Sequence, residues 1–153
     1  MATINTNPKI ATHGKAVLID ARGPRFSASL TTLVLAIALV THSAVVIALQ
    51  LVVFAIGAFV GPQKTPYAWL FKNFVKPRLS GDVPTEDVRP PQFAQKIGFL
   101  FAVVALSGSL LSAPIVFTVA TAFALAAAFL NAAFNYCLGC ELYLLITRLT
   151  HRA

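Results

Sequence analysis

The stretch "IVFTVATAFALAAAFLNAAF", residues 115–134, decides the fold of this chain. It contains no charged residue and has the length that an α-helix needs to cross the hydrocarbon core of a membrane, about 20 residues. Three more apolar stretches occur, at residues 26–41, 43–60 and 97–112. Of the 153 residues, 58% are hydrophobic and only 11% are charged, whereas a soluble domain has about 25% charged residues. The sequence therefore indicates an integral membrane protein.

Very short turns join these stretches in pairs, which predicts two helical hairpins. The spans are expected at about residues 26–42 and 43–60, and at about 96–112 and 115–136. Strands are a poor alternative for the spans, because no alternating pattern occurs and a few strands cannot close a barrel. We therefore predict an all-α integral membrane protein with four transmembrane helices arranged as two tandem hairpins.

The distribution of charge predicts the orientation. All twelve Lys and Arg residues lie in three places: the N-terminal tail of residues 1–25, the stretch 61–96, and the end from Arg148. The hairpin tips carry none, so the positive-inside rule places both termini in the cytoplasm. The tail lacks the apolar region of a cleaved signal peptide. The membrane domain is expected to cover residues 26–149, with a short tail at 150–153.

Each hairpin is expected to be followed by an amphipathic helix that lies on the cytoplasmic leaflet. The first covers about residues 66–76, with Thr65 as its N-cap and apolar and basic residues on opposite faces. The second covers about residues 140–149, and the polar, proline-rich stretch 80–92 predicts a loop. A helix packed on another protein is the alternative. The residues predicted to lie at the membrane interface are Arg22, Arg25, Trp69, Lys72, Lys76 and Arg89.

Short matches between the two halves indicate an internal repeat. The matching segments are "RGPRF" (22–26) with "RPPQF" (89–93), and "FAIGAF" (54–59) with "FLNAAF" (129–134). Carried forward, the second match places Cys140 opposite Thr65. Both halves would have the same orientation, so their pseudo-symmetry axis would run along the membrane normal.

Cys137 and Cys140 form a C-x-x-C pair near the predicted end of the fourth span. A thiol at a helix N-terminus has a lowered pKa, and a second cysteine nearby can resolve a mixed disulfide or a persulfide; Glu141 opposes this lowering. The pair is also half of a structural zinc site, or two small residues that pack well. A cytoplasmic position argues against a permanent structural disulfide. No metal and no cofactor are predicted.

Three amides in or near the spans, Gln50, Asn131 and Asn135, are candidates to line a cavity. Asn131 and Asn135 are one turn apart and would share a face beside the cysteines. The alternative is hydrogen bonding between helices. No ionisable residue lies in the middle of a span, which argues against a proton relay. Aromatic residues do not alternate with the basic ones in a soluble segment, so nucleic-acid binding is not expected.

Four stretches together resemble a bacterial membrane family, the domain-of-unknown-function family 4395. The resemblance implies a small multi-span protein of the bacterial inner membrane. Members of that family tend to be encoded beside thioredoxin-like and rhodanese-like proteins, which favours a redox or sulfur-transfer role. The resembling stretches are "DARGPRFSA", "FAIGAFVGPQKTPYAWLFKNFVKPRL", "PPQFAQKIG" and "NAAFNYCLGCELY".

The leading functional hypothesis is a thiol–disulfide or persulfide relay. Cys137 and Cys140 would exchange with a cytoplasmic thioredoxin-like or sulfurtransferase partner. A non-catalytic membrane anchor or assembly subunit is the alternative, and a small-solute permeation protein that uses Gln50 and Asn131 is a third. The sequence leaves open whether the chain is an enzyme and which oligomeric state it has.

Overall fold

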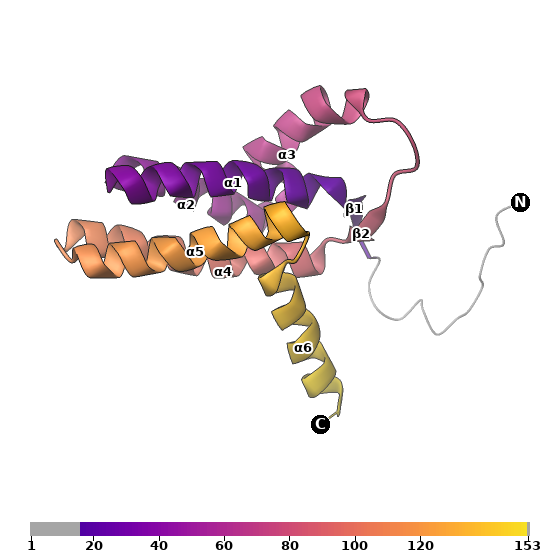
Figure 1. Ribbon diagram of the computed structural model, residues 1–153. Coiled ribbons are helices and arrows are strands. Elements are labelled where there is room, and N and C mark those ends of the chain that lie inside the picture. Colours follow the sequence, from indigo (N-terminus) through magenta and orange to yellow (C-terminus); the bar gives the residue numbers. More distant parts are fainter. Residues whose placement is uncertain (1–15, 153) are drawn as a thin grey trace, which may run out of the picture.

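Four helices packed side by side form the body of the protein, in a computed structural model that describes residues 16–152 (Figure 1). Three of them, α1, α4 and α5, are long and apolar enough to cross a membrane. The other, α2, is 12 residues long and continues as a five-residue π-helical turn at Ile56–Val60. The bounds of the four helices are Arg22–Thr41 (α1), Ala44–Ala55 (α2), Arg89–Leu110 (α4) and Pro114–Phe134 (α5).

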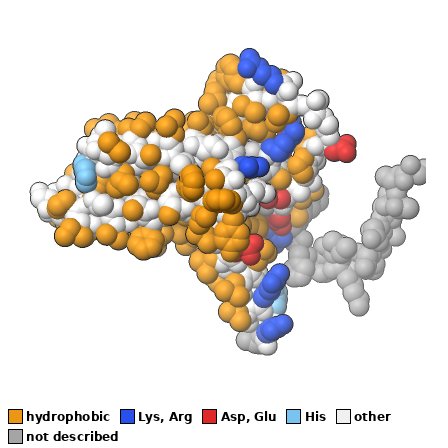
Figure 2. Space-filling model, viewed as in Figure 1, with side chains coloured by type: hydrophobic (Ala, Val, Ile, Leu, Met, Phe, Trp, Pro, Cys, Tyr) orange, Lys and Arg blue, Asp and Glu red, His pale blue; other side chains and the backbone are white. Residues whose placement is uncertain are grey.

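The core of the bundle lies between helices from both halves of the chain. α1 packs mainly against α5, and α4 packs against both α5 and α2. Leu35, Ile47 and Phe117 are almost completely buried there. Most other apolar side chains point outward, as Figure 2 shows for one face of the bundle. An apolar outer surface around an apolar core is what a lipid environment requires, so the chain is a membrane protein.

Tight turns close one end of the bundle. His42 follows the end of α1, and Ser112 lies in the turn after α4. Both residues adopt left-handed backbone conformations, with φ of 50° and 55°. The hydroxyl of Ser43 then caps α2 by accepting a hydrogen bond from the N–H of Val46 at 3.3 Å.

The opposite end, here called the polar end, carries the charged residues and two short strands. β1 (Leu18–Asp20) pairs antiparallel with β2 (Thr85–Asp87). In Figure 2 the Lys and Arg side chains gather at this end and along the segments that leave it. β1 and the start of α1 fall within the predicted tail of residues 1–25, and β2 and the start of α4 fall within the stretch 80–92 that was predicted as a loop. Strands of three residues depend on their distant partner, and local sequence gives little sign of them.

Two helical segments leave the bundle at the polar end. The first is a short α3 (Pro66–Leu70), which continues as a π-helical turn (Phe71–Val75) and a 3-10 turn (Lys76–Arg78). The second, α6 (Leu138–Arg152), projects steeply from the bundle (Figure 1). α6 begins two residues before the predicted start at Cys140, because the chain already turns at Asn135.

The helices α1 and α4 also begin earlier than the predicted spans at residues 26 and 96. Each starts with an arginine, and prolines follow in the first turn, where a missing N–H costs nothing. An aspartate two residues earlier accepts a hydrogen bond from the first N–H of each helix, Asp20 for α1 and Asp87 for α4. The helices therefore continue beyond the apolar region into the polar end.

Candidate functional site

The cysteine pair lies where α5 gives way to α6. Asn135 ends α5 in a left-handed conformation (φ 53°), and its N–H donates to the carbonyl of Leu130. Cys137 is then the residue just before α6, and its sulfur accepts a hydrogen bond from the N–H of Cys140 at 3.2 Å. The two sulfurs lie at disulfide-bonding distance, with Cα atoms 5.2 Å apart, and both cysteines are half-buried. The pair can therefore form a disulfide without any movement of the backbone.

Close packing holds this end of α6 against α4. A Cβ atom at Gly139 would lie 2.6 Å from the Cα and Cβ atoms of Ala94, so only glycine permits the approach. One turn further on, the rings of Phe93 and Tyr143 pack with their centroids 5.7 Å apart. The cysteines therefore sit on a fixed junction between two helices and not on a free loop.

A pocket of about 250 Å³ opens beside the pair, and Cys137 lines it. Most of its wall is apolar and comes from α4 and α5, with Phe101 and Phe123 stacked at a centroid distance of 6.1 Å. The amide side chains of Asn131 and Gln95 also line it. Asn131 and Cys137 were both candidates from the sequence, and the fold brings them to one pocket.

The other two amide candidates lie elsewhere. Gln50 is fully buried between helices: its carbonyl accepts a hydrogen bond from the hydroxyl of Tyr67 at 2.8 Å, and its N–H group lies 3.5 Å from the hydroxyl of Thr31. Asn135 is exposed and lines a different, shallow pocket with Arg22 and Arg25. The expectation that Asn131 and Asn135 share a helical face is wrong, because Asn135 ends the helix.

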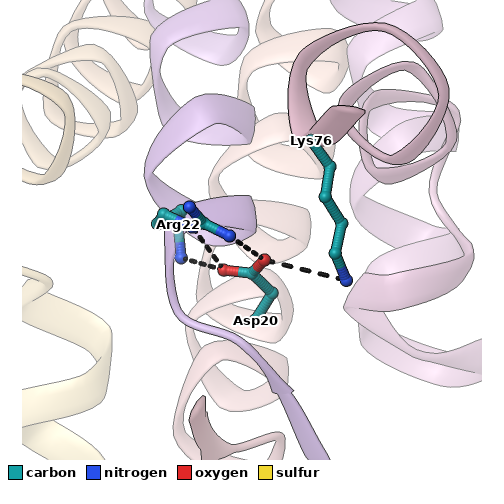
Figure 3. Close-up of polar contacts among 3 residues, drawn as sticks. All are labelled: Asp20, Arg22 and Lys76. Carbon is teal, nitrogen blue, oxygen red and sulfur yellow. Dashed lines mark hydrogen bonds and ion pairs between the residues drawn. The ribbon is translucent and has the colours of Figure 1, made fainter. Parts of the chain in front are cut away.

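Ion pairs fix the starts of the helices at the polar end. Asp20 lies between Arg22 and Lys76 (Figure 3), with an oxygen 3.0 Å from the Arg22 guanidinium and 3.8 Å from the Lys76 ammonium. Hydrogen bonds from Arg22 lower the pKa of Asp20, and burial opposes them only in part. Arg89 forms the same bidentate contact with Asp87, and it likewise lowers the pKa of that carboxyl.

The remaining residues predicted at the membrane interface are exposed at the polar end. Trp69 is 61% exposed, and Lys72 and Lys76 lie on the same segment. The side chain of Arg25 contacts the end of α5, because its Nε donates a hydrogen bond to the carbonyl of Ala132 at 3.1 Å. This hydrogen bond links the start of α1 to the end of α5, just before the cysteines.

A second pocket, of about 340 Å³, lies between β1, α1 and the α3 segment. Asp20, Lys72 and Lys76 contribute its charges, and Lys76 already neighbours Asp20. In residues 16–152, no three His, Cys, Asp or Glu side chains gather in a way that could hold a metal ion.

Several contacts of the first half have a counterpart in the second. Asp20 and Arg22 are matched by Asp87 and Arg89. The ring contact Phe26–Phe71 is matched by Phe93–Tyr143, and the cap Thr65–Ala68 by Cys137–Cys140. Two hydrogen bonds that join the halves also correspond to each other, Arg25–Ala132 and Gln92–Ala58. At the starts of α1 and α4, the sequence comparison used the R-x-P-x-F match and missed the aspartate two residues before each arginine. The structural match places Cys137, and not Cys140, opposite Thr65.

The family comparison agrees with these features. A family model described as domain of unknown function, DUF4395, matches residues 19–148, which include most of β1, all of β2 and the bundle, and the larger part of α6. The chain therefore belongs to this family, as its sequence motifs predicted. No significant match was found among curated proteins or among solved structures.

Proposed function

We propose that this protein is a membrane-bound thiol–disulfide or persulfide relay whose working pair is Cys137 and Cys140. The observation that supports the proposal most is the placement of the two sulfurs. They lie at disulfide-bonding distance at the start of α6, on a rigid junction and beside a pocket. The N-terminal end of a helix favours a thiolate, which is the reactive form in exchange.

The exchange has a defined atomic course. A thiolate of a soluble thioredoxin-like partner attacks one sulfur of the Cys137–Cys140 disulfide, forms a mixed disulfide and releases the other cysteine as a thiolate. The second thiolate of the partner then breaks the mixed disulfide, so two electrons pass from the partner to this chain. In sulfur transfer, a cysteine thiolate attacks the outer sulfur of a partner's persulfide, and the partner leaves as a thiolate.

Trapping tests the relay directly. The purified protein is mixed with reduced thioredoxin and then treated with a maleimide that adds mass to free thiols. We expect the wild-type disulfide to become a dithiol, and to form a trapped mixed disulfide with a thioredoxin variant whose second cysteine is replaced by serine. The single variants Cys137→Ser and Cys140→Ser cannot form the internal disulfide and should form no mixed disulfide with reduced thioredoxin. The double variant is the control, because the chain has no other cysteine. If neither thioredoxin nor a glutathione buffer changes the redox state of the pair, the thiol–disulfide relay is ruled out. If a purified rhodanese persulfide transfers no sulfur to the pair, the persulfide form is ruled out.

We further propose that all four bundle helices cross the bacterial inner membrane as two tandem hairpins, with the polar end in the cytoplasm. The Lys and Arg residues at that end and the uncharged turns at the other support this orientation. The α3 segment and α6 would then lie along the cytoplasmic leaflet. The paired contacts of the two halves support an internal duplication about an axis along the membrane normal.

One observation supports a second candidate, a membrane anchor or assembly subunit. No residue of α6 is buried, although the helix carries exposed Leu142, Leu145 and Leu149. An amphipathic helix of this kind binds lipid or the groove of a partner. Normal recruitment of a partner by the double cysteine-to-serine variant would favour the anchor over the relay.

A further inference from the structure

The part of the pocket beside Cys137 that the second half lines corresponds to a place that side chains fill in the first half, and Thr31 of the first half lines the pocket as well. In the first half, Thr31, Gln50 and Tyr67 meet in the interior of the bundle through the hydrogen bonds described above. The contacts shared by the two halves identify the counterparts of these residues as Gly98, Ala124 and Gly139. All three counterparts line the pocket. The second half therefore has small residues where the first half has a polar cluster.

The register behind this comparison rests on contacts. Gly61 and Asn135 each end a helix and each donate their N–H to the residue five positions earlier, Ile56 and Leu130. Gln50 precedes Gly61 by the same number of residues as Ala124 precedes Asn135. Tyr67 and Gly139 are each the second residue after the cap of the following helix, Thr65 or Cys137.

The pocket carries a buried polar atom that has no partner within residues 16–152. The Oε1 atom of Gln95 is buried and forms no hydrogen bond within the described residues. Asn131 also lines the pocket and brings an amide to its wall. A buried acceptor without a donor costs free energy, typically about 1–3 kcal/mol. A ligand that offers both hydrogen-bond donors and acceptors would remove this cost.

The pocket also reaches the outer surface of the bundle. Phe123 lines it and is 61% exposed, on a helix long and apolar enough to span the membrane. A lipid-soluble ligand can enter from this side, whereas a charged solute cannot cross the hydrocarbon to reach it. The wall thus combines a redox-capable sulfur, two amides and stacked aromatic rings.

We propose that the pocket binds a lipid-soluble quinone, which accepts the electrons of the Cys137–Cys140 dithiol. This inference rests on the proposed thiol–disulfide function and extends it by naming the oxidant. The ring would lie against Phe101 and Phe123, with a quinone carbonyl accepting from Asn131 and a quinol hydroxyl donating to Gln95. The apolar tail would leave toward the lipid past Phe123.

The electron transfer balances. The Cys137 thiolate, which faces the pocket, adds to the quinone ring and forms a carbon–sulfur bond. The Cys140 thiolate then attacks the sulfur of Cys137, so that the disulfide forms and the carbon–sulfur bond breaks with its electron pair left on the ring. The two thiol protons end on the two ring oxygens. The dithiol is oxidised by two electrons and the quinone is reduced to a quinol.

The test uses the full-length protein, reduced and placed in lipid nanodiscs, with decylubiquinone as the probe. Quinol formation is followed by absorbance, and the state of the cysteines by alkylation. Asn131→Leu removes an amide, and Ala127→Leu fills the pocket that this residue lines. We expect both variants to slow quinone reduction at least tenfold. The control Ala126→Leu makes the same change on an exposed position of α5 and should keep the wild-type rate.

Thioredoxin exchange is measured on the same samples, and it separates the two proposals. Normal exchange in Asn131→Leu and Ala127→Leu shows that these variants fold. If wild-type dithiol exchanges with thioredoxin but does not reduce the quinone, or if the pocket variants reduce it as fast as Ala126→Leu, the quinone site is wrong and the relay stands. A bound phospholipid found by mass spectrometry, with no quinone reduction, also overturns it. Absence of any thiol exchange overturns both proposals.

Discussion

At position 137 a cysteine takes the place that a threonine has at position 65. The hydroxyl of Thr65 accepts a hydrogen bond from the N–H of Ala68 at 3.2 Å, and the sulfur of Cys137 accepts one from Cys140 at the same distance. Sulfur is a weak acceptor, so cysteine is a poorer cap than threonine or serine. Capping alone therefore gives no reason for a cysteine at this position, whereas thiol chemistry does.

This comparison predicts that Cys137→Thr separates stability from chemistry. With the wild type kept reduced, the variant should match or exceed its free energy of unfolding in detergent, by about 0.5–1 kcal/mol, because a hydroxyl caps α6 better. The variant cannot form the Cys137–Cys140 disulfide, so it should lose the exchange of that disulfide with thioredoxin. Cys140→Ser is the control, because Cys140 contributes only its backbone N–H to the cap. A clear loss of stability in Cys137→Thr would mean that the sulfur has a packing role.

The Asp20 carboxylate predicts a pH dependence of stability. Its pKa is lowered in the folded protein, chiefly by hydrogen bonds from Arg22. The resulting stabilisation is complete above the pKa of an unfolded aspartate, about 3.9, and is lost as the pH falls through the lower folded pKa. We expect Asp20→Asn to flatten the decline of the unfolding free energy below about pH 5. Asp82→Asn, at an exposed loop position, should leave the decline unchanged.

At the scale of elements, the contact between α6 and α4 decides where the cysteines lie. Gly139 touches the backbone of Ala94, so a methyl group there cannot be accommodated by a side-chain rotation alone. The first half avoids this constraint, because Tyr67 at the corresponding position points its side chain into the bundle and reaches Gln50. The glycine thus determines both the approach of α6 and the space beside Cys137.

We predict that Gly139→Ala destabilises the protein by about 1–3 kcal/mol, the usual cost of overpacking. It should also change the rate at which the reduced cysteines are alkylated, because α6 must shift away from α4. Gly23→Ala is a matched control, since a Cβ atom there would make an ordinary contact of 3.7 Å with the ring of Phe71. Equal stability of the two variants would show that α6 does not depend on the close approach.

The elements also show what could be predicted from the sequence. The apolar stretches located the bundle helices, because burial in lipid requires continuous apolar sequence. The strands and the early starts of α1 and α4 were missed, since the strand pairing there joins distant residues. The cap at Cys137 is local and was missed because cysteine is not a usual N-cap residue. The Asp20–Arg22 and Asp87–Arg89 motifs were visible as D-x-R before each P-x-F. Their role needed the strand pairing, which brings the two helix starts together.

At the scale of the whole molecule, the corresponding contacts of the two halves support the proposed duplication. The N–H of Ala21 donates to the carbonyl of Pro84, and the N–H of Val88 donates to the carbonyl of Val17, both at 2.9 Å. These bonds extend the pairing of β1 and β2 at both of its ends. The candidate site occurs in one half only, where the cysteines and the pocket replace a capping threonine and a filled interior.

The number of membrane crossings depends on α2. Its 12 residues and the five of the π-helical turn span about 25 Å at roughly 1.5 Å per residue, a few ångströms short of a hydrocarbon core of about 30 Å. Local thinning of the bilayer and the flanking polar residues can compensate for this difference. We therefore predict that α2 crosses, which returns the chain to the cytoplasm before the central loop.

Single cysteines in a Cys137→Ser/Cys140→Ser background test this crossing. In right-side-out vesicles, a membrane-impermeant maleimide should label His42→Cys and Ser112→Cys, which lie at the turns, and should label Asp82→Cys only after the vesicles are inverted. If α2 does not cross, Asp82→Cys is labelled from the same side as His42→Cys, and Ser112→Cys from the other. The three positions thus distinguish four crossings from three, and four crossings are required if the start of α1 is to lie in the same compartment as the cysteines.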